Sequence, residues 1–128
     1  MLLYIMLKKK SRLLPTKKKL KAKADTLFSL YIRQRDKKCV KCGRGNEYQL
    51  HCAHIVSRFN LRLSYDPRNA LCLCSKCHRW WHDSPLESGR WFESTFPQNY
   101  EYLLKTKNET EKPDYTEVVE SLKLLNSN

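Results

Sequence analysis

The chain has 128 residues, a length that fits one domain. Its formal net charge of +12 and its pI near 9.6 suit a polyanionic partner such as nucleic acid or an anionic membrane surface. No apolar stretch approaches the roughly 20 residues that span a bilayer. The apolar start at residues 1–7 lacks both a preceding charge and a cleavage site, so a secretory signal is not expected. An intracellular location follows, where six cysteines indicate metal binding and not disulfides.

The positive charge is concentrated near the start of the chain, where nine basic residues and no acidic one lie between Lys8 and Lys23. We expect residues 1–19 to form a basic arm that either contacts nucleic acid or stays solvated, and charge alone does not separate these roles. From Leu20 the apolar residues recur at helical steps of three and four, which predicts a helix. These residues are Leu20, Ala24, Leu27, Phe28, Tyr31 and Ile32.

The middle of the chain alternates between short elements and loops. Residues 39–45 (CVKCGRG) are typical of a tight knuckle, and residues 48–55 are predicted as a strand of a hairpin. Residues 56–67 read as a loop that ends in the turn pair Asp-Pro. A helix is expected from about Ser75 to about His82.

Chain breaks are expected after that helix, at Ser84-Pro85 and at Gly89. Four aromatic residues beyond them predict one more short helix that packs on the body: Trp91, Phe92, Phe96 and Tyr100. Residues 106–113 are polar and linker-like, and residues 115–125 predict a weakly amphipathic helix. Trp80, Trp81 and Trp91 are expected to serve packing and not base stacking.

Two cysteine pairs have the spacing of a zinc knuckle. They are Cys39-x-x-Cys42 and Cys74-x-x-Cys77, and a two-residue gap lets both thiolates of a pair reach one tetrahedral ion. The segment from Cys39 to His82 is too short to bury a self-sufficient core, and zinc binding can supply the missing stability. We therefore predict a structural Zn²⁺. Of the other two cysteines, Cys72 is expected in the core, and the position of Cys52 is left open.

Histidine and asparagine residues follow the first cysteine pair at suggestive intervals. His51 and His54 precede Asn69, and His78 and His82 follow it. The last two are separated by four residues on the expected helix, so both imidazoles project from one face and can hold one metal ion.

The run from Pro67 to His78 (PRNALCLCSKCH) resembles the second half of the motif of HNH (His-Asn-His) endonucleases, in which an asparagine precedes CxxCH. The spacing of His54, Asn69, His78 and His82 is similar to that of colicin-type nucleases. Residues 24–58 resemble phage NinG-type recombination proteins and related phage HNH nucleases. The resemblance covers roughly residues 20–82. It implies an α+β fold, with a small ββα-metal core and a four-cysteine zinc knuckle flanked by helices. We expect this domain at residues 20–104, followed by a polar, partly helical extension at residues 105–128.

The resemblance also implies the roles of the site residues. His54 falls at the position of the general base, and a histidine can take a proton from water at neutral pH. His78 and His82 would hold one divalent ion, Mg²⁺, Mn²⁺, Ni²⁺ or Zn²⁺, that acts as a Lewis acid. Asn69 is expected to hold the loop that aims His54, and Arg58 to pair with a phosphate oxygen. Cleavage would leave a 5′-phosphate and a 3′-hydroxyl.

One position departs from the family pattern. The residue before the general base is commonly Asp or His and binds the metal, whereas this chain has Ala53, which cannot. Either His51 or Cys52 turns toward the metal instead, or water and phosphate complete the site around the two helical histidines. The sequence leaves these alternatives open.

The sequence therefore favours a metal-dependent DNA endonuclease for phage DNA recombination or processing. The resemblance to NinG-type proteins implies branched or junction DNA as its substrate. The alternative is a non-catalytic zinc-ribbon DNA-binding protein, for which Ala53 is the best argument. An RNA-directed nuclease or ribosome-associated zinc protein fits the charge but lacks aromatic RNA-binding signatures. The sequence does not decide between a monomer that nicks and a dimer that cuts both strands.

Overall fold

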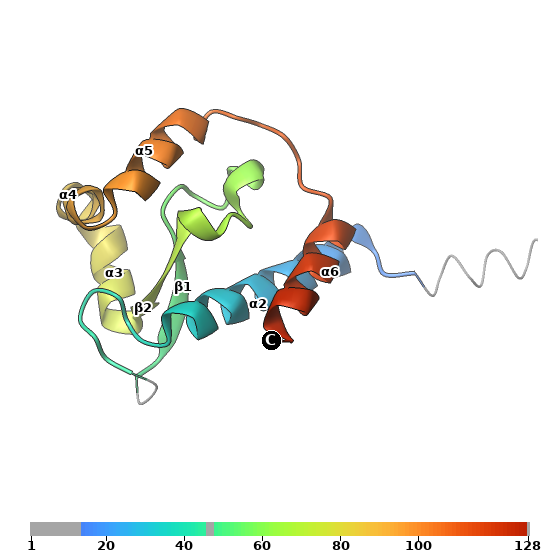
Figure 1. Cartoon of the computed structure of the whole chain (residues 1–128), viewed down its shortest axis with the longest axis horizontal. Helices are drawn as coiled ribbons and strands as arrows, with labels where there is room; N and C mark the ends of the chain where they lie inside the picture. The colour runs from blue at the N-terminus through green and yellow to red at the C-terminus, as the bar shows by residue number, and fades with distance from the viewer. Residues whose placement is uncertain (1–13, 46–47, 128) are drawn as a thin grey trace, which may run out of the picture.

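The computed structural model describes residues 14–45 and 48–127 (Figure 1). Most of the predicted basic arm, residues 1–13, lies outside this range. The elements follow in the order α2 (Lys17–Asp36), β1 (Leu50–His54), the 3-10 turns η1 (Leu61–Leu63) and η2 (Pro67–Asn69), β2 (Ala70–Cys74), α3 (Ser75–Asp83), α4 (Pro85–Thr95), α5 (Pro97–Thr106) and α6 (Tyr115–Asn126). In the described part of the chain no helix is long and apolar enough to cross a membrane. The result is an α+β structure with one small sheet.

The sheet is an antiparallel pair in which Cys52 lies opposite Cys72 and His54 lies opposite Ala70. All five residues of β2 are buried, because both faces of this strand are covered. Leu71 and Leu73 belong to a cluster with side chains of α4 and α5, whereas Cys72 belongs to a second cluster with side chains of α2. The prediction that Cys72 is a core residue is confirmed.

Helix α2 begins at Lys17, three residues before the apolar pattern begins at Leu20. The hydroxyl of Thr16 accepts a hydrogen bond from the Lys19 N–H at 3.2 Å, and this cap stabilises the basic first turn. The buried face of the helix consists of Ala24, Phe28 and Ile32, one residue per turn. The helix thus lays a narrow apolar stripe on the sheet and leaves its lysines in solvent.

The end of α2 is hydrogen-bonded to β2 and to the turn that precedes it. The Arg35 guanidinium donates to the carbonyl oxygens of Pro67 and Ala70 at 2.7 and 2.8 Å. The Asp36 carboxylate accepts a bond from the Cys72 N–H at 2.9 Å. These long-range bonds fix the helix against the start and the middle of β2.

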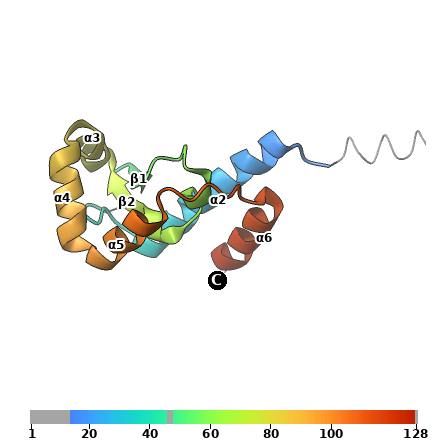
Figure 2. The ribbon, with the colours of Figure 1, turned by 90° about the horizontal axis from the view of Figure 1, so that it is seen from above.

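The predicted C-terminal helix is present as α6 and packs along α2, far from α4 (Figures 1 and 2). Val119 and Leu122 are buried in this contact, and the Asn126 amide donates to the Leu27 carbonyl at 3.1 Å. The linker between α5 and α6 passes over the loop that follows β1, where Arg62 pairs with Glu109. The extension is therefore packed on the body of the molecule.

The expected single helix after α3 is wrong, because two helices form there. Gly89, predicted as a break, lies inside α4. A helical glycine costs about 1 kcal/mol relative to alanine, and burial of Phe92 on the same helix offsets that cost. The real break is at Phe96, where Pro97 starts α5.

Candidate functional site

The four predicted zinc cysteines come together. The sulfur atoms of Cys39, Cys42, Cys74 and Cys77 all lie within 4.8 Å of one another, and the Cys42 and Cys74 sulfurs are 3.7 Å apart. Two thiolates on a tetrahedral zinc, each about 2.3 Å from the ion, are about 3.8 Å apart. The residues therefore fit a Zn²⁺ ion.

Local backbone geometry builds this group. Gly43 has a φ of 80°, which a glycine adopts without strain, and its N–H bonds to the Cys39 carbonyl at 2.9 Å. The Cys77 N–H points at the Cys74 sulfur at 3.4 Å, at the first turn of α3. Burial alone would raise the pKa of Cys39, but nearby backbone hydrogen bonds lower it to about 7, which favours the thiolate that binds metal.

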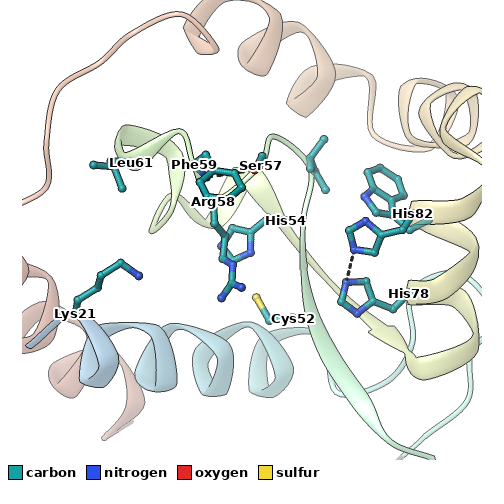
Figure 3. Close-up of a pocket in the computed structure, with 11 residues that line it drawn as sticks. Lys21, Cys52, His54, Ser57, Arg58, Phe59, Leu61, His78 and His82 are labelled. Atoms are coloured by element: carbon teal, nitrogen blue, oxygen red, sulfur yellow. Dashed lines mark hydrogen bonds between the residues drawn. The ribbon is translucent and has the colours of Figure 1, made fainter. Parts of the chain in front are cut away.

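A separate cleft of about 970 Å³ opens between β1, the following loop and α3 (Figure 3). Four of the predicted site residues line it, namely His54, Arg58, His78 and His82. Its other lining residues are Lys21, Cys52, Ile55, Ser57, Phe59, Leu61 and Trp81. Among the residues that the structure describes, this lining contains cations and imidazoles but no carboxylate. Such a cleft suits a negatively charged ligand.

His54 ends β1, and its imidazole has a fixed orientation. Its Nε2 atom lies 2.9 Å from the carbonyl oxygen of Ser64. A carbonyl only accepts, so Nε2 carries the hydrogen and Nδ1 of the neutral ring keeps its lone pair. The ring also packs against Phe28 of α2, with 5.6 Å between the ring centroids.

The surroundings of His54 favour its neutral form. Burial lowers the pKa of this imidazole, and the positive charge of Arg58 lowers it further, against the opposing bond to Ser64. Figure 3 shows the Arg58 side chain beside the His54 ring, and both residues also line a smaller neighbouring cavity. At neutral pH the ring is a proton acceptor.

Asn69 lies outside the cleft, fully buried beneath the loop that follows His54. Its amide oxygen accepts from the Val56 N–H at 2.7 Å, and its amide nitrogen donates to the carbonyls of Val56 and Leu63, each at 3.0 Å. One side chain thus bonds to the backbone near the start and in the middle of the loop. These contacts are of the amide-to-backbone kind expected for Asn69.

His78 and His82 of α3 line the same wall of the cleft with their rings close together. The Nε2 atoms of His78 and His82 are 3.2 Å apart (Figure 3). Two imidazoles on one ion, each at about 2.1 Å, would be about 3.4 Å apart in tetrahedral geometry. Burial and the neighbouring imidazoles lower the pKa of His78 to about 4, so its ring is neutral and able to bind a cation.

The residues offered as substitutes for the missing ligand do not join this pair. His51 faces the opposite nitrogen of His78, with 2.9 Å between the two Nδ1 atoms, which is a hydrogen-bond distance. Cys52 lines the cleft, and burial raises the pKa of its thiol to about 12. Ala53 is buried in the core. Within residues 14–45 and 48–127, only the four-cysteine group brings three or more ligand atoms together.

Sequence reasoning missed several residues of the cleft. Ser64 acts through its backbone carbonyl, for which the sequence carries no signal. Lys21 reaches the cleft from α2. Trp81, which was predicted as a packing residue, lines the cleft and also packs edge-on against Phe92. Phe59 was open to detection, as an aromatic residue between polar neighbours in the predicted loop.

Residues 39–84 match the family model described as HNH endonuclease. The match covers a little over a third of the chain, including β1, β2 and α3, and contains every predicted catalytic and metal-binding residue. It indicates nuclease activity. No curated protein and no solved structure matched the chain.

Proposed function

We propose that this protein is a metal-dependent DNA endonuclease that hydrolyses phosphodiester bonds in the cleft between β1 and α3. One observation carries the proposal. The His54 imidazole, fixed by the Ser64 carbonyl with Nδ1 left basic, lines the same cleft as the facing imidazoles of His78 and His82. A general base and a pair of cation ligands in one carboxylate-free cleft suit a phosphate substrate.

His54 is the general base. Its Nδ1 takes a proton from water as the water oxygen bonds to phosphorus, and the bond from phosphorus to O3′ breaks. The leaving O3′ receives a proton from solvent, which gives a 5′-phosphate and a 3′-hydroxyl. Because burial keeps the imidazole neutral, this base is available without first losing a proton.

His78 and His82 would hold the catalytic ion through their Nε2 atoms. A divalent ion bound there supplies Lewis-acid stabilisation of the charge that develops on the phosphate. Arg58 and Lys21 line the same cleft and would bind non-bridging phosphate oxygens. With only two protein ligands, water and phosphate would complete the site.

His51 is assigned to orienting His78. When Nε2 of His78 offers its lone pair to the ion, its Nδ1 carries the hydrogen and donates it to Nδ1 of His51. The hydrogen of His51 then sits on its own Nε2. In this arrangement His51 would accept from the tautomer of His78 that binds a cation.

Branched DNA, as in phage recombination, is the substrate that the likeness to NinG-type proteins suggests. A four-way junction therefore belongs in the first assay beside supercoiled plasmid. Zinc-loaded protein is incubated with each DNA, first with no added ion and then with Mg²⁺, Mn²⁺, Ni²⁺ or excess Zn²⁺. We expect cleavage that requires an added ion.

The decisive variant is His54→Ala, which should lower the cleavage rate at least 100-fold, because general-base catalysis contributes about 10²–10⁴. Zinc content and DNA affinity should stay the same. The matched control is Arg79→Ala, which changes an exposed residue of α3 outside the cleft. Cleavage by His54→Ala at the wild-type rate would exclude His54 as the base.

A non-catalytic zinc-ribbon DNA-binding protein is the second candidate. It is favoured by Ala53 and by the fact that two histidines, and not three ligands, face each other in the described cleft. Metal stoichiometry separates the two functions. A ribbon binds one ion per chain, whereas the nuclease binds a second, weaker one that His78→Ala removes.

A further inference from the structure

Phe59 is the most exposed large apolar residue of the described chain, with 96% of its surface accessible. It lines the rim of the cleft, directly after Arg58 and five residues after His54 (Figure 3). The HNH fold does not need this ring for packing, since it belongs to none of the buried clusters.

The backbone around Phe59 is well bonded although its ring is free. The Phe59 N–H donates to the Ser57 hydroxyl at 3.2 Å, and the Asn60 N–H donates to the Ser57 carbonyl at 2.8 Å. The Ser64 hydroxyl donates to the Arg58 carbonyl at 3.0 Å, and the Asn60 amide donates to the Lys107 carbonyl. The loop therefore holds the ring out to solvent from a fixed base.

The surroundings of the ring select its partner. Its sequence neighbours Ser57, Arg58 and Asn60 are polar, and no other exposed large apolar side chain of the described chain lines this cleft. The ring is therefore not part of a broad exposed apolar patch of the kind that a protein partner would cover. Arg58 supplies positive charge in the same cleft, which is also lined by Lys21, whose ammonium pairs with Asp25 at 3.0 Å. Negative charge combined with a flat apolar face is the chemistry of a nucleotide.

We propose that Phe59 stacks on an unpaired base next to the scissile phosphate, so that DNA with unpaired nucleotides is the preferred substrate. This inference rests on the proposed nuclease function. In a paired duplex both faces of each base are already covered, and the ring would first have to open a base step. An unpaired base offers its face directly, as at the branch point of a junction or in a bulge.

The test measures binding by full-length, zinc-loaded protein that carries His54→Ala, so that cleavage does not interfere. One probe is a duplex with 2-aminopurine paired opposite thymine, and the other places the same base in a two-nucleotide bulge. Anisotropy of an end label gives the affinity, and quenching of 2-aminopurine fluorescence reports stacking. Phe59→Ala and Phe59→Trp are compared with Leu124→Ala, an exposed apolar residue on α6 outside the cleft.

We expect the bulged probe to bind more tightly than the paired probe and to be quenched on binding. Phe59→Ala should weaken binding of the bulged probe roughly 5- to 150-fold, the range of one aromatic–base stack, and change the paired probe less than twofold. Phe59→Trp should retain the preference, and Leu124→Ala should change neither probe.

Equal weakening of both probes by Phe59→Ala, or no weakening of either, would overturn the inference. So would a Phe59→Ala variant that differs from wild type in oligomeric state, since the ring would then belong to a protein interface. Paired DNA that binds and, with His54 intact, is cut would leave the proposed function standing in each case. Protein that binds neither probe would overturn both.

Discussion

Three neighbouring groups set the orientation and the protonation state of the His54 imidazole. The Ser64 carbonyl fixes the hydrogen on Nε2, the Phe28 ring covers one side, and the Arg58 guanidinium adds a positive charge. Burial and this charge disfavour the imidazolium and keep the pKa of His54 below its ordinary value of 6.5. The geometry and the electrostatics thus select the same protonation state, the one that accepts a proton.

The pH dependence of cleavage follows from this shift. Only the neutral ring is a base, so kcat/KM should rise with pH through a pKa below 6.5 and stay level from there to neutral pH. The profile is measured with the divalent ion at saturation, so that metal loss at low pH does not contribute. Arg58→Ala should move the inflection to higher pH, because it removes a charge that lowers the pKa. A wild-type inflection well above 7 would contradict the assignment.

The loop between β1 and β2 is the element that aims the site, and Asn69 closes it from below. Its amide makes three backbone bonds, to both polar groups of Val56 and to the Leu63 carbonyl. Ser64, which orients His54, follows Leu63 directly. The loop therefore determines how His54, the proposed base, is oriented, through the backbone carbonyl of Ser64.

Asn69→Ala should lower the free energy of unfolding by about 2–4 kcal/mol, because it leaves buried backbone groups without partners. Cleavage should fall more than tenfold in the folded fraction, since the Ser64 carbonyl is no longer held against His54. Urea unfolding and single-turnover cleavage check the two effects. The matched control Asn108→Ala, at an exposed position, should change stability by no more than about 0.5 kcal/mol. Equal stability of both variants would show that the loop does not depend on the amide.

At the scale of the whole molecule, the zinc group joins the segment between α2 and β1, the end of β2 and the start of α3. Its removal should separate these elements, since the described core consists of three small clusters. Cys42→Ala should lose zinc and lower Tm, as should a strong chelator on the wild type. The control Cys52→Ala changes a cysteine outside the zinc group and should retain one zinc per chain. Metal analysis and thermal unfolding by circular dichroism distinguish the two, and full zinc in Cys42→Ala would contradict the site.

Sequence patterns predicted the elements that have one exposed face. α2 and α6 showed helical periodicity, and α3 begins at Ser75 as expected. β2 gave no alternation because both of its faces are buried, so periodicity alone did not predict it, and a second strand was expected from the family resemblance. The split into α4 and α5 was missed because Gly89 looked like a break, whereas tertiary packing holds it inside a helix.

The chemistry of the cleft was predictable where it depends on side-chain spacing, as for His78 and His82. It was not predictable where backbone atoms or distant elements contribute. The Ser64 carbonyl leaves no mark in the sequence, and Lys21 reaches the cleft only because α2 packs across the sheet. The pairing of His51 with His78, and not with an ion shared by His82, also required three-dimensional distances.

Helix α3 carries one cysteine of the four-cysteine group, Cys77, and the next residue, His78, lines the cleft as a proposed ligand of the catalytic ion. Each residue turns an α-helix by about 100°, so these adjacent side chains leave the axis in different directions. The cysteines at the start of the helix therefore fix the rotation of α3 about its axis, and with it the direction in which the imidazoles point. Two sites with separate chemistry share one angular reference, and neither can be redesigned without regard to the other.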